Sequence, residues 1–169
     1  MDGARIQVTG QDEALEALQG YVERASNPRG MFDNIGARLV VSTQRRFERK
    51  QGPDGSPWPP AIRELLGDGR PTLRVSGILV QSLTHNATES GVEVGTNVLY
   101  AAIHQLGGTI TAKTSKGLRF KVGGQWATKQ QVTIPARPFL GIDEDDETEI
   151  LAIARDWIAD DEAGTGAAP

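Results

Sequence analysis

The chain has 169 residues, enough for one domain with a buried core, and its 38% hydrophobic and 24% charged residues are typical of a globular protein. The absence of cysteine excludes disulfides, thiolate metal sites and cysteine nucleophiles, and two histidines are too few for a histidine-rich metal site. No apolar run reaches the roughly 18 residues of a membrane helix. The net charge of −4 argues against a surface that binds nucleic acid throughout.

The first fifty residues are predicted to be mainly helical. Alternation of apolar and polar residues predicts a short strand at Ile6 to Val8. Apolar residues spaced by three and four then predict helices over 12–26 and 29–50. The stripes of these two helices are Leu15, Leu18 and Val22, and then Phe32, Ile35, Leu39, Thr43 and Phe47. The basic end of the second helix suits the helix dipole, although contact with phosphate is an alternative.

The middle of the chain is predicted to be loops and short helices. Four prolines and two glycines in 51–60 (QGPDGSPWPP) predict a series of turns, and the large Trp58 within it is expected to pin this loop to the domain or to a neighbour. One or two helical turns are expected in 61–69, and a short helix over 76–83.

The second half is predicted to mix strands and helices. A β-hairpin is expected over 84–97, then a helix over 98–106 that ends at a double glycine. Strands are expected within 109–115, 117–124 and 129–136. A helix follows over 143–161, with acids in its first turn and the buried stripe Ile150, Ile153, Ala154 and Trp157.

These elements predict one α+β domain over 1–162. It would hold a small antiparallel sheet with a β-hairpin, flanked by a long central helix and a C-terminal helix, and residues 163–169 would form a disordered tail. The first residues have no apolar core behind a basic start, so no secretory signal is expected.

Catalysis has one candidate residue, His104. A general base needs a nucleophile and an orienting partner, and the sequence has no GxSxG or HExxH motif to supply them. No catalytic, cofactor-binding or metal-binding residue is therefore predicted, and a small hydrolase that uses His104 remains the alternative. The segment IPARPFLG is stiff, because Pro135 and Pro138 fix two φ angles. It displays Arg137 and Phe139 either as a core plug or as an assembly contact.

Charge is separated along the second half of the chain. Residues 109–131 carry five bases and no acid, and residues 143–149 carry six acids and no base. Solvated surfaces are one interpretation, and pairing across a subunit boundary is the other.

Several motifs together carry a resemblance to a known family. VGTNVLYAAIHQLGG, followed by IPARPFLGI and an acidic terminal helix, is similar to the phage virion morphogenesis family, the tail-completion or head–tail joining proteins of Mu-like and P2-like phages. RRFERKQGPDGSPWPP and LRVSGILVQSL agree with it, so the resemblance runs from about Ile6 to Ile158. Two departures are Leu106, where members usually carry phenylalanine, and the individual stretch 109–131.

The resemblance implies a non-enzymatic structural protein of the virion neck, formed in the host cytoplasm. It would form a ring, expected to be a hexamer, that contacts the neck connector and tail-tube proteins and could touch DNA in the lumen without sequence preference. The alternatives are an assembly factor that leaves the particle and a DNA-binding module. Two sets of residues are singled out. The interface candidates are Trp58, Lys113, Lys116, Arg119, Lys121, Arg137, Phe139, Asp143, Glu144, Asp145 and Asp146, and the fold-fixing residues are Tyr100, His104, Gly107, Gly108, Pro135 and Pro138.

Overall fold

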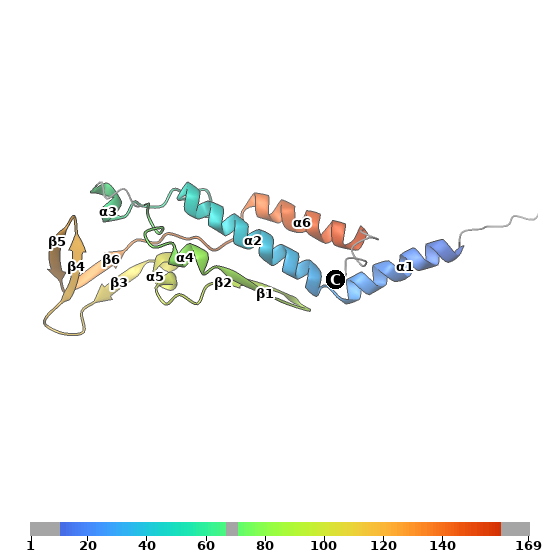
Figure 1. The fold of residues 1–169 in the computed structure, drawn as a ribbon, viewed down its shortest axis with the longest axis horizontal. Helices are drawn as coiled ribbons and strands as arrows, with labels where there is room; N and C mark the ends of the chain where they lie inside the picture. Colours follow the sequence, from blue (N-terminus) through green and yellow to red (C-terminus); the bar gives the residue numbers. More distant parts are fainter. Residues whose placement is uncertain (1–10, 67–70, 160–169) are drawn as a thin grey trace, which may run out of the picture.

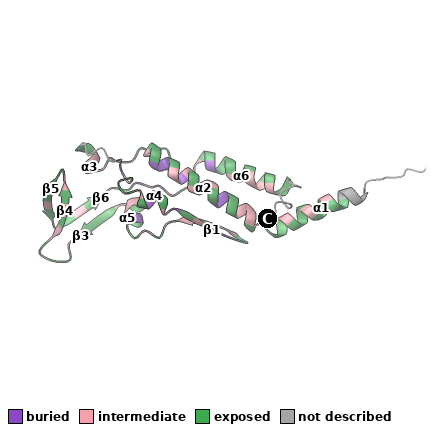
Figure 2. Cartoon of the chain, viewed as in Figure 1, coloured by how far each residue is buried: buried purple, intermediate pink, exposed green. Residues whose placement is uncertain are grey.

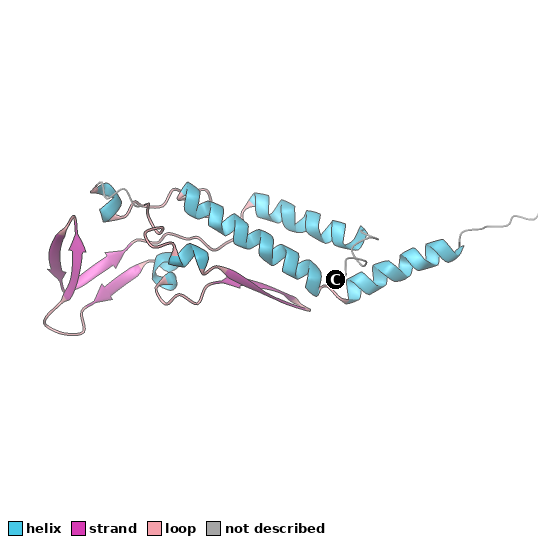
Figure 3. Ribbon diagram, in the orientation of Figure 1, coloured by secondary structure: helices cyan, strands magenta, loops and turns pink. Residues whose placement is uncertain are grey.

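The computed structural model describes residues 11–66 and 71–159 of the chain. Helices and small antiparallel sheets are mixed within them, which confirms the α+β class (Figures 1 and 3). The strands form three separate two-stranded sheets in this part of the chain, where the sequence predicted one small sheet. The predicted strand at Ile6 to Val8 and the predicted tail at 163–169 lie outside the described residues.

The long helix α2 (Arg29–Arg49) runs through the centre of the structure, and α6 (Glu144–Ala159) lies alongside it (Figure 1). Three residues of the stripe predicted for α2, Ile35, Thr43 and Phe47, are buried, and the other two, Phe32 and Leu39, are partly buried. The helix ends where Lys50 turns into the left-handed region at φ 55°, and the N–H of this residue donates to the Arg46 carbonyl.

The helix α1 (Gln11–Ser26) is confirmed as an element, but its apolar stripe is not buried within the described structure. Leu15, Leu18 and Val22 are 58%, 59% and 66% exposed. Periodicity reveals which face of a helix is apolar and cannot reveal whether another part of the same chain covers it. In Figure 1 most of α1 extends beyond the ends of α2 and α6.

A β-hairpin packs directly against α2. Its strands β1 (Thr84–Thr88) and β2 (Gly91–Gly95) pair antiparallel, as the sequence predicts, and both contact α2. The approach is close at Gly36, where a Cβ atom would lie 2.5 Å from the His85 ring and 2.7 Å from Val92 Cγ2.

Substituting Gly36 with alanine is therefore expected to destabilise the fold by about 1–3 kcal/mol, because the hairpin must shift away from α2. Gly20→Ala is the matched control, since the new methyl group on α1 would approach only the end of the Arg24 side chain, at 3.2 Å, and no backbone atom. We expect that change to stabilise the protein by about 0.5–1 kcal/mol through helix propensity. Urea unfolding compares both variants with the wild type, and equal effects of the two changes would contradict the close packing at Gly36.

The remaining strands form two further pairs. β3 (Gly108–Thr111) pairs with β6 (Gln131–Ile134), and β4 (Leu118–Val122) pairs with β5 (Gln125–Lys129). The sequence did not predict β5. The two glycines between β4 and β5 have φ of 55° and 84°, and a two-residue glycine turn reverses the chain into a hairpin at once.

The chain also forms three short helices among the described residues: α3 (Ile62–Leu65), α4 (Ile78–Gln81) and α5 (Ala101–Leu106). The last two occupy only parts of the helices predicted over 76–83 and 98–106. The core lies where α2, α4, α5 and the segment before α6 converge (Figure 2). Its buried members are Phe47, Trp58, Leu79, Leu83, Ala101 and Phe139. Among the described helices, none combines the length and hydropathy needed to cross a membrane.

Candidate assembly surfaces

A buried ion network joins α2 to the start of α6. The Arg46 guanidinium is 3% exposed and forms ion pairs with Asp146 and, at 2.9 Å, with Asp143. Its other terminal nitrogen donates to the carbonyl oxygens of Phe139 at 3.2 Å and Gly141 at 2.7 Å. One side chain of α2 therefore holds both the segment that precedes α6 and the first turn of α6.

The two aspartates also cap α6. Asp146 N–H donates to Asp143 Oδ1 at 2.9 Å, and Asp143 N–H donates to Asp146 Oδ2 at 3.3 Å, a reciprocal capping box. Burial acts to raise the pKa of Asp143, but the Asp146 N–H and the Arg46 guanidinium together hold this pKa below its ordinary value. The acids at the helix start thus have a partner in α2 that the sequence reasoning missed. Two features of the sequence could have indicated this contact. Arg46 lies beside the buried stripe of α2, and Asp143 and Asp146 have the D-x-x-D spacing of a capping pair.

The predicted acidic interface needs a correction at this point. Asp146 is 1% exposed, and Asp143 is turned toward Arg46, so these two side chains serve the interior. Glu144 and Asp145 are exposed and remain candidates for a contact with a neighbour.

The segment 135–140 is a core plug, one of the two alternatives predicted for it. Phe139 is fully buried, with its ring 5.3 Å from that of Phe47, which in turn meets the Trp58 ring edge to face at 5.3 Å. Trp58 Nε1 donates to the Pro138 carbonyl at 2.8 Å, so the 51–60 loop is pinned to its own domain.

The Arg137 side chain is buried as well, and it binds backbone. Its guanidinium donates to the carbonyl oxygens of Pro59 at 2.6 Å and Pro60 at 3.3 Å. Trp58, Arg137 and Phe139 therefore lie inside the subunit, which is the core alternative for them and not the assembly interface for which they were candidates. The sequence could not predict the burial of these side chains, because a stiff segment can direct its side chains toward the core of its own subunit or toward a neighbouring subunit.

Gln105 is a fold-fixing residue that the sequence reasoning did not identify. Its side-chain oxygen accepts from the backbone N–H groups of Phe139 at 2.9 Å and Leu140 at 3.0 Å, and its nitrogen donates to the Leu140 carbonyl at 2.9 Å. One amide thus pairs three backbone groups of a segment that has no neighbouring strand there. The family motifs YAAIHQLGG and IPARPFLG are locked together through this side chain.

The predicted fold-fixing residues lie at the same junction. The carbonyl of His104 accepts from Arg137 N–H at 2.7 Å, and Gly107 follows the helix at φ 71°. A Cβ atom at Gly107 would lie 2.8 Å from Ala136 N, so the close approach of the two motifs requires glycine there. Gly108 begins β3, and the exposed Pro135 directly follows its partner strand β6.

His104 itself lies half-buried in a pocket of about 370 Å³ with Tyr100, Thr72 and Arg137. The Tyr100 ring meets its imidazole edge to face at 6.0 Å. Burial lowers the pKa of His104, and the nearby Arg137 cation lowers this pKa further, so the imidazole is neutral at pH 7. Its Nδ1 is buried, and within the described residues it has no hydrogen-bond partner, whereas a general base is oriented by one.

Glu64 ties α3 to the rest of the domain. Its carboxylate pairs with Lys50 and accepts from the hydroxyl and N–H of Thr72, and these contacts lower the pKa of Glu64 to about 2. Because the folded protein keeps this group ionised below its ordinary pKa of 4.5, Glu64 stabilises the fold above that pH. This stabilisation is lost as the pH falls from about 4.5 toward 2.

Glu64→Gln is accordingly expected to lower the urea midpoint at pH 7. The gap between variant and wild type should shrink below pH 4.5 and vanish only below about pH 2, where the carboxyl of the folded wild type is also neutral. Glu48→Gln, at an exposed site on α2, is the control. A gap that does not change with pH would contradict the role of the charge.

The basic candidates lie at the opposite end of the structure from α1 (Figure 1). Lys113, Lys116, Arg119 and Lys121 are all exposed. Arg119 and Lys121 share one face of the β4–β5 hairpin with Trp126, and the Arg119 guanidinium lies 4.4 Å from the Trp126 ring centroid.

Comparison with known proteins identifies the family. The family model for phage virion morphogenesis matches residues 10–159 of the chain. The chain belongs to the phage virion morphogenesis family. Its match covers every described element from α1 to α6, and the family motifs quoted above are the segments that meet around Arg46, Trp58 and Gln105.

Two relatives come from Mu-like phages. The Mu-like prophage FluMu G protein 2 of Haemophilus influenzae is 27% identical over 153 residues, which span 90% of this chain and 94% of the relative. The putative capsid assembly protein G of Escherichia phage Mu is 29% identical over 163 residues, which span 92% of this chain and 89% of the relative. No solved structure matches the chain significantly.

Proposed function

We propose that the protein is a structural component of the phage neck that assembles into a ring of identical subunits. In this role it completes the end of the tail or joins the head connector to the tail late in assembly. The observation that carries the proposal is membership of a virion morphogenesis family, over nearly the whole chain.

The distribution of side chains supports an assembly role. Polar groups on Arg46, Gln105, Arg137 and Asp146 bind the chain's own backbone or each other and hold the fold. Among the described residues, more large apolar side chains are exposed than buried, and they include whole faces of helices. Such faces are typical of proteins that bury surface against partners.

We infer that the protein acts without catalysis. His104 is the one catalytic candidate, and its ring packs against Tyr100 with Nδ1 unpaired among the described residues. The backbone of the same residue holds Arg137 in place. A variant His104→Ala is therefore expected to affect folding before it affects any reaction.

We propose that the ring is a hexamer that contacts the neck connector and the tail-tube proteins. The protein would be made in the host cytoplasm and would become part of the virion. The exposed bases of 109–131 support contact with a subunit or with DNA in the lumen. The acidic face at Glu144 and Asp145 is too far from that segment in the chain's own fold to neutralise it (Figure 1).

A second candidate function is an assembly factor that leaves before the particle matures. It is favoured by the name of the phage Mu relative, a putative capsid assembly protein. The two roles differ in the final location of the protein: a neck component stays in the mature particle, and an assembly factor does not.

Quantitative mass spectrometry of purified particles separates these roles. A neck component is expected at a fixed, ring-like number of copies per particle, and at the neck when labelled for electron microscopy. Absence from mature particles, with presence in assembly intermediates, would overturn the neck proposal and support the assembly factor.

A further inference from the structure

We propose that α1 of one subunit docks on the far end of the next subunit, on a surface made by α3 and the β4–β5 hairpin. This inference rests on the proposed self-assembly and names the two surfaces that perform it. The occupant of the exposed α1 face is thus a second copy of this chain, bound head to tail.

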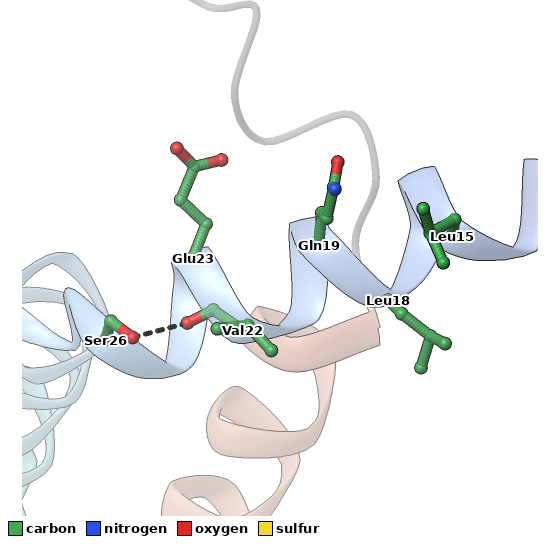
Figure 4. A pocket seen from close by; sticks show the side chains of 6 residues that line it. All are labelled: Leu15, Leu18, Gln19, Val22, Glu23 and Ser26. Carbon is green, nitrogen blue, oxygen red and sulfur yellow. Dashed lines mark hydrogen bonds between the residues drawn. The ribbon is translucent and has the colours of Figure 1, made fainter. Parts of the chain in front are cut away.

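The first surface is the apolar face of α1. Leu15, Leu18 and Val22 follow one another along it and line a shallow open groove of about 660 Å³, with Gln19 and Glu23 beside them (Figure 4). All three apolar side chains are more than half exposed. Burying a leucine or valine side chain fully is worth roughly 1.5–3 kcal/mol, so this face gains substantially from a partner.

The C-terminal end of α1 is held against α6. The Arg24 guanidinium donates to the Ile158 carbonyl at 3.0 and 3.2 Å, and Trp157 Nε1 donates to the Arg24 carbonyl at 3.2 Å. Leu15 and Leu18 lie farther from this anchor, toward the end of α1 that extends past α2 and α6, whereas Val22 lies within one turn of Arg24 (Figure 1). The helix is therefore fixed in direction and presents its apolar face away from the domain.

The second surface, here called the tip, lies at the other end of the long axis (Figure 1). It consists of exposed apolar residues of α3 and the residue after it, together with the outer face of the β4–β5 hairpin. The two parts are adjacent, since a Cβ atom at Gly123 would lie 3.3 Å from Leu66 Cδ1. The apolar members of the tip are Ile62, Leu65, Leu66 and Trp126, all more than half exposed.

Charge complementarity identifies the occupant. The sequence of α1 has four acids, Asp12, Glu13, Glu16 and Glu23, against one base, Arg24, which gives a net charge of −3. Residues 109–131 have five bases and no acid, a net charge of +5. Glu64, beside the tip, is already paired with Lys50. An acidic helix with an apolar stripe thus matches a basic surface with an exposed tryptophan and leucines, in both charge and polarity.

The positions of the two surfaces explain why the contact is between copies. They lie at opposite ends of one chain, so they cannot meet within a subunit. A contact between two different surfaces is heterologous, and when its rotation closes it generates a ring. The same geometry accounts for the apolar residues left exposed at both ends.

A mixing experiment tests the pairing. The first variant, Leu18→Gln with Val22→Gln, damages the α1 face and keeps helix-forming residues; the second, Leu65→Gln with Trp126→Thr, damages the tip. Each variant alone is expected to self-associate at least about tenfold more weakly than the wild type in light scattering.

Mixed at equal concentrations, the two variants should form heterodimers and no larger species, because each pair of subunits can form only one intact junction. Circular dichroism and urea unfolding check that both fold.

Controls at other exposed leucines make the result specific. Leu99→Gln and Leu151→Gln remove side chains that are 97% and 56% exposed and lie outside both surfaces, so they should assemble like the wild type. A charge exchange adds a second readout: Glu16→Lys with Glu23→Lys should weaken assembly, and adding Arg119→Glu with Lys121→Glu should restore it.

The opposing outcomes are distinct. If the tip variant assembles like the wild type while the α1 variant does not, the α1 face binds itself or another protein, and the head-to-tail pairing is wrong. If the tip variant loses only salt-dependent DNA binding, the tip is a nucleic-acid surface and the pairing is wrong. Wild-type assembly untouched by every variant overturns the pairing and leaves the neck role standing. A wild type that is monomeric at all salt concentrations overturns both the pairing and the self-assembly, and particle composition then tests the neck role alone.

Discussion

Replacing Arg46 with alanine is expected to lower the free energy of unfolding by about 3–5 kcal/mol. The change would leave Asp146, 1% exposed, as a buried carboxylate without its cation, and would release the carbonyl oxygens of Phe139 and Gly141. It would also loosen the first turn of α6, because the capping aspartates are held by the same guanidinium.

Arg45 provides a matched control one position earlier on α2. Its side chain is exposed, so Arg45→Ala should change the free energy of unfolding by no more than about 0.5 kcal/mol. Urea unfolding at pH 7 measures both variants. Equal effects of the two substitutions would show that the buried network contributes nothing beyond an ordinary surface arginine.

Phe139→Ala is expected to cost about 3–5 kcal/mol of stability. The ring is completely buried against Phe47, and Gln105 holds the backbone of Phe139 itself, so removal of the ring leaves a cavity among rings that pack at 5.3 Å. The backbone hydrogen bonds of Gln105 keep the segment in place, so the site has little freedom to collapse around the void.

Leu106→Ala is the control for this prediction. Leu106 belongs to the neighbouring family motif but is 77% exposed, so its truncation should alter stability by less than about 0.5 kcal/mol. Thermal and urea unfolding measure both changes. If Phe139→Ala and Leu106→Ala lowered the free energy of unfolding by the same small amount, the core would not lie around Phe47, Trp58 and Phe139.

The two predictions separate folding from assembly in this family. Variants at Arg46 and Phe139 should fail to appear in particles because the chain is less stable, and not because a contact surface is lost. Variants on the α1 face or the tip should fold normally and fail only in association. Stability measurements therefore have to precede any interpretation of particle composition.

Much of the secondary structure was predictable from local patterns. The stripe of α2 and the β1–β2 hairpin were confirmed, because period 3.6 and period 2 report directly which backbone geometry buries apolar residues. The hairpin strand β5 was missed, since QWATK offers only one large apolar residue and its outer face is exposed. The helices α4 and α5 are shorter than predicted: α5 begins at Ala101 and ends at Leu106 as expected, and α4 spans only Ile78–Gln81.

The candidate site was less predictable. The sequence named Trp58, Arg137, Phe139 and Asp146 as interface candidates and left packing into the domain open for the first three, and the fold buries all four. Gln105 was overlooked because a lone glutamine on a short helix has no periodic or charge signature. Its role depends on a backbone segment more than thirty residues away.

The sequence alone determined the α+β class, the position of the long helix, the stiffness of 135–138 and the separation of charge, because each of these depends on neighbours within one or two turns. Only the tertiary structure decided which of the marked side chains face inward. It paired Arg46 with Asp143 and Asp146 across almost a hundred residues, and it left the stripe of α1 uncovered. The physical reason is that a side chain is buried only when another part of the chain packs against it. The spacing of residues within one element does not reveal which part that is.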